Sequence, residues 1–349
     1  MMKSPHSARL PYLAAGLVPA LLLAFTLTIT PAIHAEDADG SFVEITPELQ
    51  TAVSRGLQYL AAQQQPDGSF GAERYGRHVG ITALAGVAFM SQGSLPDRGI
   101  YQENVRKALD FMLDSVHENG LVSADTSHGP MYGHGFATLF LAEVYGQTHD
   151  GRVHEALIKA VRLIIGSQNS EGGWRYQPVP SEADVSVTIC QVMGLRAARN
   201  AGVKVPKETI DKAVDYVRRC QNADGGFRYM LNSGNSAFPR SAAGVATLYY
   251  AGIYQDQAID RGLAYLMTEL PGGGRQTPHY EYGHYYAVQA MYMAGGRYWR
   301  TWFPAIRKEL LDKQDAAGAW EGQAGKSYGT AMALIILQMP NRYLPIFQK

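Results

Sequence analysis

Along the chain, segments that mix apolar and polar positions alternate with segments that are apolar at almost every position. In the mixed segments, such as residues 156–163 and 210–217, apolar side chains recur every three to four residues, which predicts amphipathic helices with one wet face. A helix that is apolar all round must be buried. The apolar segments therefore predict six inner helices, at residues 79–90, 135–145, 185–198, 241–252, 285–294 and 330–339.

A turn motif follows each mixed segment and repeats along the chain. It reads Gln, three residues, Gly, one residue, and then Trp or Phe. Full copies begin at Gln64, Gln168, Gln221 and Gln314. Weaker copies surround Gly120 and Gly273, so the motif glycines recur about every 50 residues. A glycine at this point can adopt the left-handed backbone that ends a helix. The pattern predicts an all-α fold, a single (α/α)6 toroid of six helix pairs over residues 46–340.

An open solenoid is the alternative arrangement of the same helix pairs. Closure into a ring is favoured because the sequence shows no polar terminal repeat of the kind that caps an open array. The last segment, residues 341–349, is partly apolar, and we expect this C-terminal tail to pack back on the toroid.

The first 35 residues differ from the rest of the chain. Lys3 and Arg9 precede an apolar stretch, and the small residue Ala35 stands directly before Glu36. This pattern predicts a signal peptide over residues 1–35, so that the folded part would be exported to the periplasm or the extracellular space. An uncleaved membrane anchor is the alternative, because the apolar stretch nearly reaches the length that spans a bilayer.

Composition narrows the classes of partner. Lys+Arg and Asp+Glu number 31 each, so no basic excess would drive binding to nucleic acid. The two cysteines, Cys190 and Cys220, are too few for a disulfide scaffold or a four-cysteine zinc module. Tyrosine is abundant, at 21 residues, and aromatic rings with polar tips suit a lined cavity. Association with a membrane periphery and the oligomeric state stay open.

The Gln-to-aromatic turn followed by a buried helix resembles the repeat of squalene cyclases and protein prenyltransferase β subunits. The resemblance covers nearly all of the chain after the signal segment and implies a terpenoid cyclase-like toroid. Activity does not follow from the fold alone. Squalene–hopene-type cyclases use an Asp-x-Asp-Asp run as their proton source, and the nearest run here keeps only Asp184 and Thr188. A complete squalene cyclase is therefore not expected.

Protein prenyltransferases bind zinc through Asp-x-Cys on the fifth inner helix and a histidine on the sixth. The matching positions here are Tyr282, His284 and Gly329. One nitrogen ligand cannot hold zinc, which needs three or four ligands, so we expect no metal and no other cofactor.

The same resemblance implies three ligand contacts. Tyr285 matches the family's tyrosine beside the zinc-binding cysteine, near the prenyl diphosphate. Arg275 and His279 lie close to where the family places cationic contacts to the diphosphate.

In such a toroid all inner helices start at one end, where their N-termini form a ring of positive partial charge that suits an anionic or polar group. Thr82, Thr138 and Thr188 are expected one turn below this ring. A polar mouth above an apolar well is the usual form of a small-molecule site. The residues expected at the mouth are His78, Tyr132, His134, Asp184, Arg240, Tyr282, His284 and Tyr328.

We assign candidate acid–base roles to Asp184, His134 and His78, because a histidine beside an aspartate can act as a general base with its orienting partner. Simpler interpretations stand beside these roles. His78 and Asp184 could serve only as helix caps. The similar tripeptides at 132–134 and 282–284 could be a repeated packing device.

Three functions remain open at this point. The first is an exported toroid that binds a small apolar or amphipathic molecule in its central well, an isoprenoid being one candidate, with zinc-independent acid–base catalysis as an option. The second is a secreted carbohydrate-active lyase or hydrolase on the same barrel. A hydrolase needs two carboxylates roughly 5–9.5 Å apart, and the mouth acids expected here are Asp184, Glu182 and Glu281. The third is a non-catalytic interaction scaffold, which is favoured if the chain's own side chains fill the well.

Overall fold

The computed structural model describes residues 42–71, 76–125, 129–272 and 277–348, and all statements about the structure concern these residues. From Val43 onward they belong to one compact unit. The predicted signal peptide and Arg275 lie outside the described residues. Within them there are twelve α-helices, two short 3₁₀ helices and no β-strand, which confirms the all-α prediction. None of the described helices is long and apolar enough to cross a membrane.

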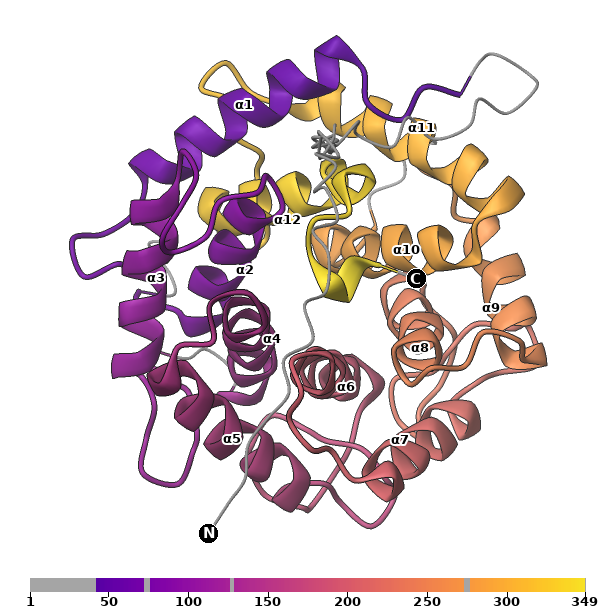
Figure 1. The fold of residues 1–349 in the computed structure, drawn as a ribbon. Helices are drawn as coiled ribbons and strands as arrows, with labels where there is room; N and C mark the ends of the chain where they lie inside the picture. Colours follow the sequence, from indigo (N-terminus) through magenta and orange to yellow (C-terminus); the bar gives the residue numbers. More distant parts are fainter. Residues whose placement is uncertain (1–41, 72–75, 126–128, 273–276, 349) are drawn as a thin grey trace, which may run out of the picture. The chain divides into compact units, whose positions relative to one another are not determined.

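The helices form two concentric rings (Figure 1). The outer ring consists of α1 (Pro47–Ala62), α3 (Gln102–Asp114), α5 (Gly151–Gly166), α7 (Lys207–Arg219), α9 (Gln257–Met267) and α11 (Gly296–Lys313). The inner ring consists of α2 (Val79–Met90), α4 (Met131–Thr148), α6 (Val185–Asn200), α8 (Phe238–Tyr250), α10 (Tyr280–Ala294) and α12 (Lys326–Leu337). Each inner helix contacts the next, and α12 contacts α2, so the inner ring is closed.

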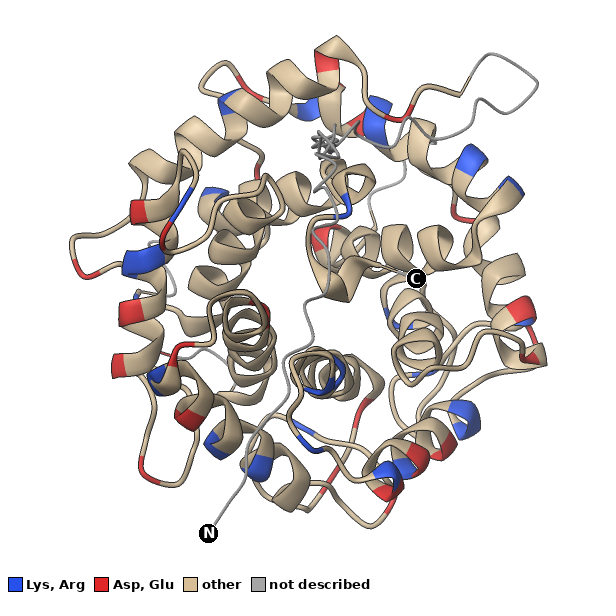
Figure 2. Cartoon of the chain, in the orientation of Figure 1, with Lys and Arg blue, Asp and Glu red and all other residues tan. Residues whose placement is uncertain are grey.

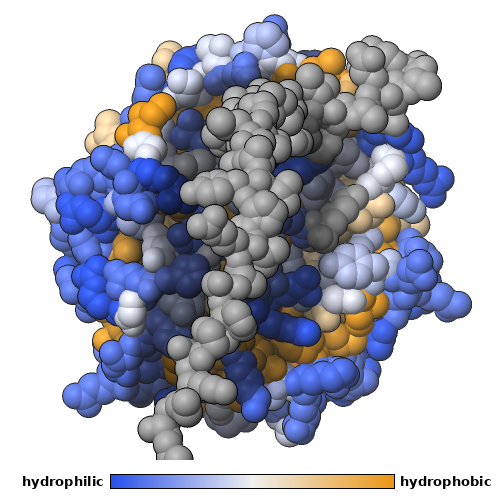
Figure 3. Space-filling view, viewed as in Figure 1, coloured by the Kyte–Doolittle hydropathy of each residue, from blue (hydrophilic) through white to orange (hydrophobic). Residues whose placement is uncertain are grey.

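The segregation of charge explains the two rings. Charged residues lie mostly on the outer helices and loops, while the inner helices carry few (Figure 2). Accordingly, the visible rim of the molecule is mostly hydrophilic (Figure 3). Helix α2 has every residue buried, whereas α7 buries only one face. Burial of apolar area at roughly 25 cal/mol per Å² favours the arrangement in which the all-apolar helices lie inside.

The glutamine of the turn motif joins neighbouring repeats. The side-chain amide of Gln168 donates to the carbonyl oxygens of Gly172 and of Thr209, the latter in the next outer helix, at 2.8 Å each. Gln64 and Gln221 make the equivalent pair of bonds. Gln314, in the last repeat, donates to Ala52 of α1 at 2.8 Å. The last repeat therefore binds the first, and the open-solenoid alternative is wrong.

Two features require glycine at the motif position: a left-handed backbone conformation and a close neighbouring atom. Gly172 has φ of +102°, a value that residues other than glycine rarely adopt. A Cβ at this position would lie 2.2 Å from the carbonyl oxygen of Lys212. The close approach brings the turn against the next outer helix, where the glutamine bond forms.

A second contact recurs in the repeats that contain α2, α6, α8 and α12. The backbone N–H of the turn aromatic donates to a hydroxyl in the first turns of the inner helix, as from Phe70 to Thr82 at 2.8 Å. The same bond joins Trp174 to Thr188, Phe227 to Ser241 and Trp320 to Thr330. This bond fixes the register of these four inner helices against their own turns.

The inner ring encloses a central space, called the bore below. The residues after α12 close one end of it. The Gln338 side chain donates to Ala88 of α2 at 3.0 Å, and Asn341 donates to Ser91 at 3.0 Å. The 3₁₀ helix η2 (Pro345–Phe347) then packs on α6, and Figure 1 shows this segment reaching into the ring. Ile346 and Phe347 are buried there. This end, where the inner helices finish, is therefore filled by the chain itself.

Candidate functional site

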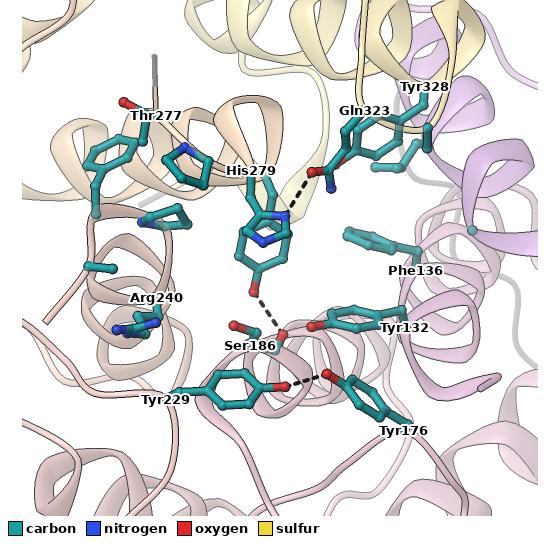
Figure 4. A pocket seen from close by; sticks show the side chains of 18 of the residues that line it. Tyr132, Phe136, Tyr176, Ser186, Tyr229, Arg240, Thr277, His279, Gln323 and Tyr328 are labelled. Atoms are coloured by element: carbon teal, nitrogen blue, oxygen red, sulfur yellow. Dashed lines mark hydrogen bonds between the residues drawn. The ribbon is translucent and has the colours of Figure 1, made fainter. Parts of the chain in front are cut away.

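A cavity of about 870 Å³ opens at the opposite end, where the inner helices begin (Figure 4). Most of its wall residues lie in the first two turns of the inner helices or in the loops before them, and Tyr265 comes from the outer helix α9. Ile81, Leu84 and Phe136, from α2 and α4, form an apolar wall. The remaining wall is rich in tyrosine and also carries Arg240 and Glu269. The site therefore combines an apolar side with a hydrogen-bonding side, the usual composition of a small-molecule site.

The structure places six of the residues expected from the sequence on this wall. They are His78, Tyr132, Arg240, His279, Tyr282 and Tyr328. Tyr282 extends across the opening, and its hydroxyl donates to the carbonyl oxygen of Ser186 at 2.8 Å. Its ring meets that of Tyr132 edge-on, with centroids 6.4 Å apart. The two similar tripeptides of repeats 2 and 5 thus bring their tyrosines, and not their histidines, together.

His134 and His284 do not reach the cavity, which corrects the expectation that they enter the mouth. His134 is fully buried between its turn and α5: its Nδ1 accepts from the Val122 N–H at 3.1 Å, and its Nε2 lies 3.2 Å from the Ala160 carbonyl oxygen. His284 packs among the rings of Phe238, Tyr280 and Trp302. Burial lowers the pKa of His134 to about 4 and that of His284 to about 3, so both are neutral.

The repeat explains this placement. His134 accepts from its turn through the bond that Thr82, Thr188 and Thr330 make in other repeats. His284 follows Tyr-Gly as Thr330 does, and therefore stands at the same register. Thr138, expected level with Thr82, lies one turn further along and donates to the carbonyl oxygen of His134. The packing-device interpretation of the tripeptides is the one that this geometry supports.

Tyr285 also lies away from the cavity, contrary to expectation. It is fully buried, its ring contacts Phe136 edge-on, and its hydroxyl donates to the Met193 sulfur at 3.5 Å. Beside it, the Tyr286 hydroxyl lies 3.3 Å from the Cys190 sulfur. These side chains fill the bore below the cavity, so the site is a pocket about two helical turns deep rather than a long apolar well.

His78 and Asp184 both cap the inner helices that they precede. Nδ1 of His78 accepts from the Gly80 N–H at 3.1 Å, and Oδ1 of Asp184 accepts from the Val187 N–H at 2.8 Å. Because Nδ1 of His78 is an acceptor, its proton is on Nε2, and burial lowers the pKa of this imidazole. The cap interpretation of both residues therefore has direct structural support, and no acid–base role is needed to explain their positions.

Asp184 nevertheless has an unusual environment. It is fully buried and is not part of the cavity wall. Burial raises the pKa of its carboxyl to about 6, although backbone hydrogen bonds and the Tyr229 hydroxyl act in the opposite direction. Oδ2 has no hydrogen-bond partner among the described residues.

Two polar wall residues are held rigidly by their own contacts. Arg240 donates from Nε to the Phe227 carbonyl oxygen at 3.1 Å and from Nη2 to Asn235 at 2.5 Å. Nδ1 of His279 lies 2.8 Å from Oε1 of Gln323, which joins α10 to the loop before α12. His279 has φ of +54°, a strained backbone for a residue other than glycine. Preorganised groups of this kind lower the cost of ordering when a ligand binds.

Sequence reasoning missed the tyrosines that the loops supply. Tyr176 and Tyr229 line the cavity, and their hydroxyl oxygens are 2.5 Å apart (Figure 4). Each stands two residues after a turn aromatic, in Trp-Arg-Tyr and Phe-Arg-Tyr of repeats 3 and 4. That shared tripeptide, read against the repeat, is the signal that would have found them.

The described residues contain no group of three His, Cys, Asp or Glu side chains that could hold a metal ion. Of the carboxylates expected at the mouth, Glu182 pairs with Arg175 at 3.3 Å, and Glu281 borders a separate cleft between α10, α11 and α12. The single carboxylate among the wall residues described is Glu269. The described wall therefore does not offer the carboxylate pair of a glycoside hydrolase.

Residues 44–272 match the Prenyltransferase alpha-alpha toroid domain. Among curated proteins, the chain is 27% identical over 183 residues to drimenyl diphosphate synthase of Streptomyces showdoensis, and this match covers 51% of the chain. It is 23% identical over 236 residues to squalene–hopene cyclase of Zymomonas mobilis, a match that covers 59% of the chain. The matches cover only 32% and 34% of these two relatives.

Solved structures share the fold at low sequence identity. A variant of the type II terpene cyclase MstE from Scytonema, in complex with geranylgeranyl dihydroxybenzoate, superposes with a TM-score of 0.61 at 15% identity. That match covers 85% of this chain and 98% of the cyclase chain. The cellobiose 2-epimerase of Spirochaeta thermophila gives a TM-score of 0.65 at 14% identity, again over 85% of this chain and 98% of the other. The toroid thus serves both terpenoid and sugar enzymes.

Proposed function

The chain belongs to the prenyltransferase α/α toroid family, and from this premise we propose that its cavity binds one amphipathic molecule of terpenoid type without protonating it for cyclisation. The observation that carries the proposal is the two-sided wall. An apolar skeleton would lie against Ile81, Leu84 and Phe136, and a polar head would face the tyrosines and Arg240. A volume of about 870 Å³ is within the range of small-molecule sites.

The position of the cyclase acid supports binding over cyclisation. Aligned with the Asp-x-Asp-Asp run, Ser186 and Val187 replace the second and third acids. Ser186 lines the cavity, so a hydroxyl stands at a wall position where an acid would be needed. A serine hydroxyl is too weak an acid to protonate an alkene, in contrast to a carboxylic acid held neutral in an apolar site.

The relatives support the ligand class and not the reaction. Drimenyl diphosphate synthase and squalene–hopene cyclase are both named for terpenoid products, and MstE binds a geranylgeranyl compound. Because the chain spans about a third of each curated relative, neither activity transfers as a whole. Export of the protein, proposed from the pattern of residues 1–35, would place this binding outside the cytoplasm.

The first test is mass spectrometry of an organic extract from the protein purified from an exporting host. We expect a stoichiometric terpenoid.

Direct titration with farnesol by calorimetry is the second test, on the wild type and on Ser186→Phe, whose ring would occupy the cavity. Ser54→Phe, on the exposed face of α1, is the matched control. Equal farnesol affinity in wild type and Ser186→Phe, or no binding by the wild type, would overturn the proposal.

A further inference from the structure

The imidazole of His279 is a wall group whose position its own helix does not explain. His279 directly precedes α10, as His78 precedes α2. The His78 ring bends back and accepts from the Gly80 N–H of its own helix. The His279 side chain makes no such cap and reaches instead to Gln323, in the loop before α12. Capping, the simplest role for a polar residue at this place, is therefore not its role.

The backbone holds this ring in place at a cost in free energy. His279 has φ of +54° and ψ of +45°, the left-handed conformation that side chains disfavour. Pro278 restricts the chain directly before it. The carbonyl oxygen of His279 accepts from the Gly283 N–H at 2.9 Å, within the first turn of α10. Strained residues persist where the surrounding structure holds them, and they cluster at functional sites.

The bond to Gln323 decides which nitrogen of the His279 ring carries the proton. Nδ1 lies 2.8 Å from Oε1 of Gln323, and a carboxamide oxygen can only accept. In the neutral ring Nδ1 is therefore the donor, and Nε2 keeps its lone pair. Nε2 has no hydrogen-bond partner among the described residues. Figure 4 shows the ring directed into the cavity, beside Gln323.

We propose that Nε2 of His279 accepts a hydrogen bond from a hydroxyl group of the ligand, so that the cavity selects a terpenoid alcohol. The inference rests on the proposed function and names the polar group of its ligand. An ether or carbonyl oxygen can only accept, so it would face the lone pair of Nε2 without a bond. His279 is the contact that determines specificity, and Gln323 is a positioning residue that acts through it.

The charge of the described wall favours a neutral head over a diphosphate. Apart from its histidines, its charged side chains are Arg240 and Glu269, one of each sign. A diphosphate carries several negative charges and is bound by groups that donate hydrogen bonds or bring positive charge. The lone pair of Nε2 would repel its oxygens. His279, expected from the resemblance as a cationic contact to a diphosphate, thus acts as a neutral acceptor.

The position of the ring proton can be measured without any ligand, from the ¹⁵N chemical shifts of the histidine rings at pH 8.5, where imidazole is neutral. His279→Asn assigns the signals. We expect the wild-type proton on Nδ1. Gln323→Leu should shift the proton toward Nε2, because Nδ1 loses its acceptor, whereas Gln102→Leu, on the exposed face of α3, should not. A wild-type proton on Nε2 would mean that Gln323 donates, and would overturn the inference.

Selectivity is measured by calorimetry at pH 8.5 with farnesol and farnesyl methyl ether, which share a carbon skeleton and differ in the O–H. The wild type should bind farnesol about fivefold to tenfold more tightly, the effect of one hydrogen bond. His279→Asn, a change that tolerates the left-handed backbone, should lose this preference, and Gln323→Leu should lose part of it. His149→Asn is the matched control, since His149 is also exposed, has φ of +57° and lies at the closed end.

The outcomes separate this inference from the proposed function. If both probes bind and their affinity ratio is the same in the wild type and in His279→Asn, the inference is wrong while the proposed function stands. If the wild type binds neither probe, the proposed function fails and alcohol selection fails with it. Should His279→Asn not fold, as judged by circular dichroism, Gln323→Leu keeps the ring and its backbone, and an unchanged ratio in that variant overturns the inference.

Discussion

The two ends of the bore are built from the same helices and end differently. At the N-terminal ends of the inner helices, side chains do not fill the centre of the ring, and a cavity lies there with Tyr132, Tyr282 and Arg240 in its wall. At the C-terminal ends, Ile346 and Phe347 enter the ring and leave no exposed apolar surface of their own. The toroid is thus a container closed at one end.

The difference shows how each end handles polar groups. The mouth keeps its polar atoms at a surface, where a ligand or water can bond them. The closed end buries Glu143, whose carboxyl receives a backbone N–H from Ile346 and whose Oε2 is left without a partner among the described residues. Burial raises the pKa of Glu143 to about 8, so this carboxyl is mostly neutral at pH 7. The same scaffold therefore exposes polar atoms to a cavity at one end and buries them at the other.

The largest effect is expected from emptying the closed end. Phe347→Ala removes a buried ring and should lower the free energy of unfolding by about 3 to 5 kcal/mol in urea titrations. Tyr343→Ala, in the same tail but exposed, should change it by less than about 0.5 kcal/mol. Equal effects of the two variants would show that the tail does not seal the bore.

The next largest effect is the pH dependence that Glu143 gives to the free energy of unfolding. Its folded pKa lies above the ordinary value of 4.5, so its contribution is complete below pH 4.5 and is lost as pH rises toward 8. The loss between pH 5 and 8 should be about 3 kcal/mol in the free energy of unfolding. Glu143→Gln should flatten this part of the profile, and Glu155→Gln, on the exposed face of α5, should leave it unchanged. A wild-type profile without this slope would contradict the assignment.

Two substitutions that each introduce a phenylalanine ring compare the free space at the two ends. Ala142→Phe, at a fully packed position in α4, should cost about 2 kcal/mol through overpacking. Ser186→Phe adds the same ring to the cavity wall and should cost less than about 0.5 kcal/mol. Thermal unfolding of both variants measures the contrast, which disappears if the cavity is filled in solution.

The smallest effect is expected at a polar residue near the mouth that belongs to the scaffold. His134→Thr substitutes the residue found at this register in other repeats and keeps an acceptor for the Val122 N–H. We expect a loss of about 1 kcal/mol in the free energy of unfolding, since the contact with Ala160 disappears, and an unchanged farnesol affinity. A tenfold loss of affinity would place His134 in the site after all.

Much of the fold was predictable because burial and turn chemistry agree. The predicted helix at 79–90 coincides with α2, whose start His78 caps and whose residues are all buried. Helices α4 and α10 begin at Met131 and Tyr280, about one turn before the predicted starts. Their first turns contain tyrosine and histidine, which broke the apolar pattern although the backbone was already helical.

The site was less predictable, for a geometric reason. A residue at the start of an inner helix can face the bore or its own turn, and these directions differ by one or two positions along the sequence. Tyr132 and His134 stand two residues apart and face opposite ways. The tyrosines Tyr176 and Tyr229 lie in loops, so helical periodicity cannot predict where they point. Only the alignment of whole repeats separates scaffold from site at this end.

The bond from Gln314 to Ala52 also bears on how such a protein can change over evolution. Open repeat arrays gain or lose units by duplication or deletion, because each unit needs only its neighbours. In this ring the sixth unit must meet the first, and α12 must contact α2. A chain with one unit added or removed would leave a glutamine and an inner helix without partners. We therefore expect the number of repeats to resist change and diversification to concentrate in the loops and first helical turns that surround the mouth.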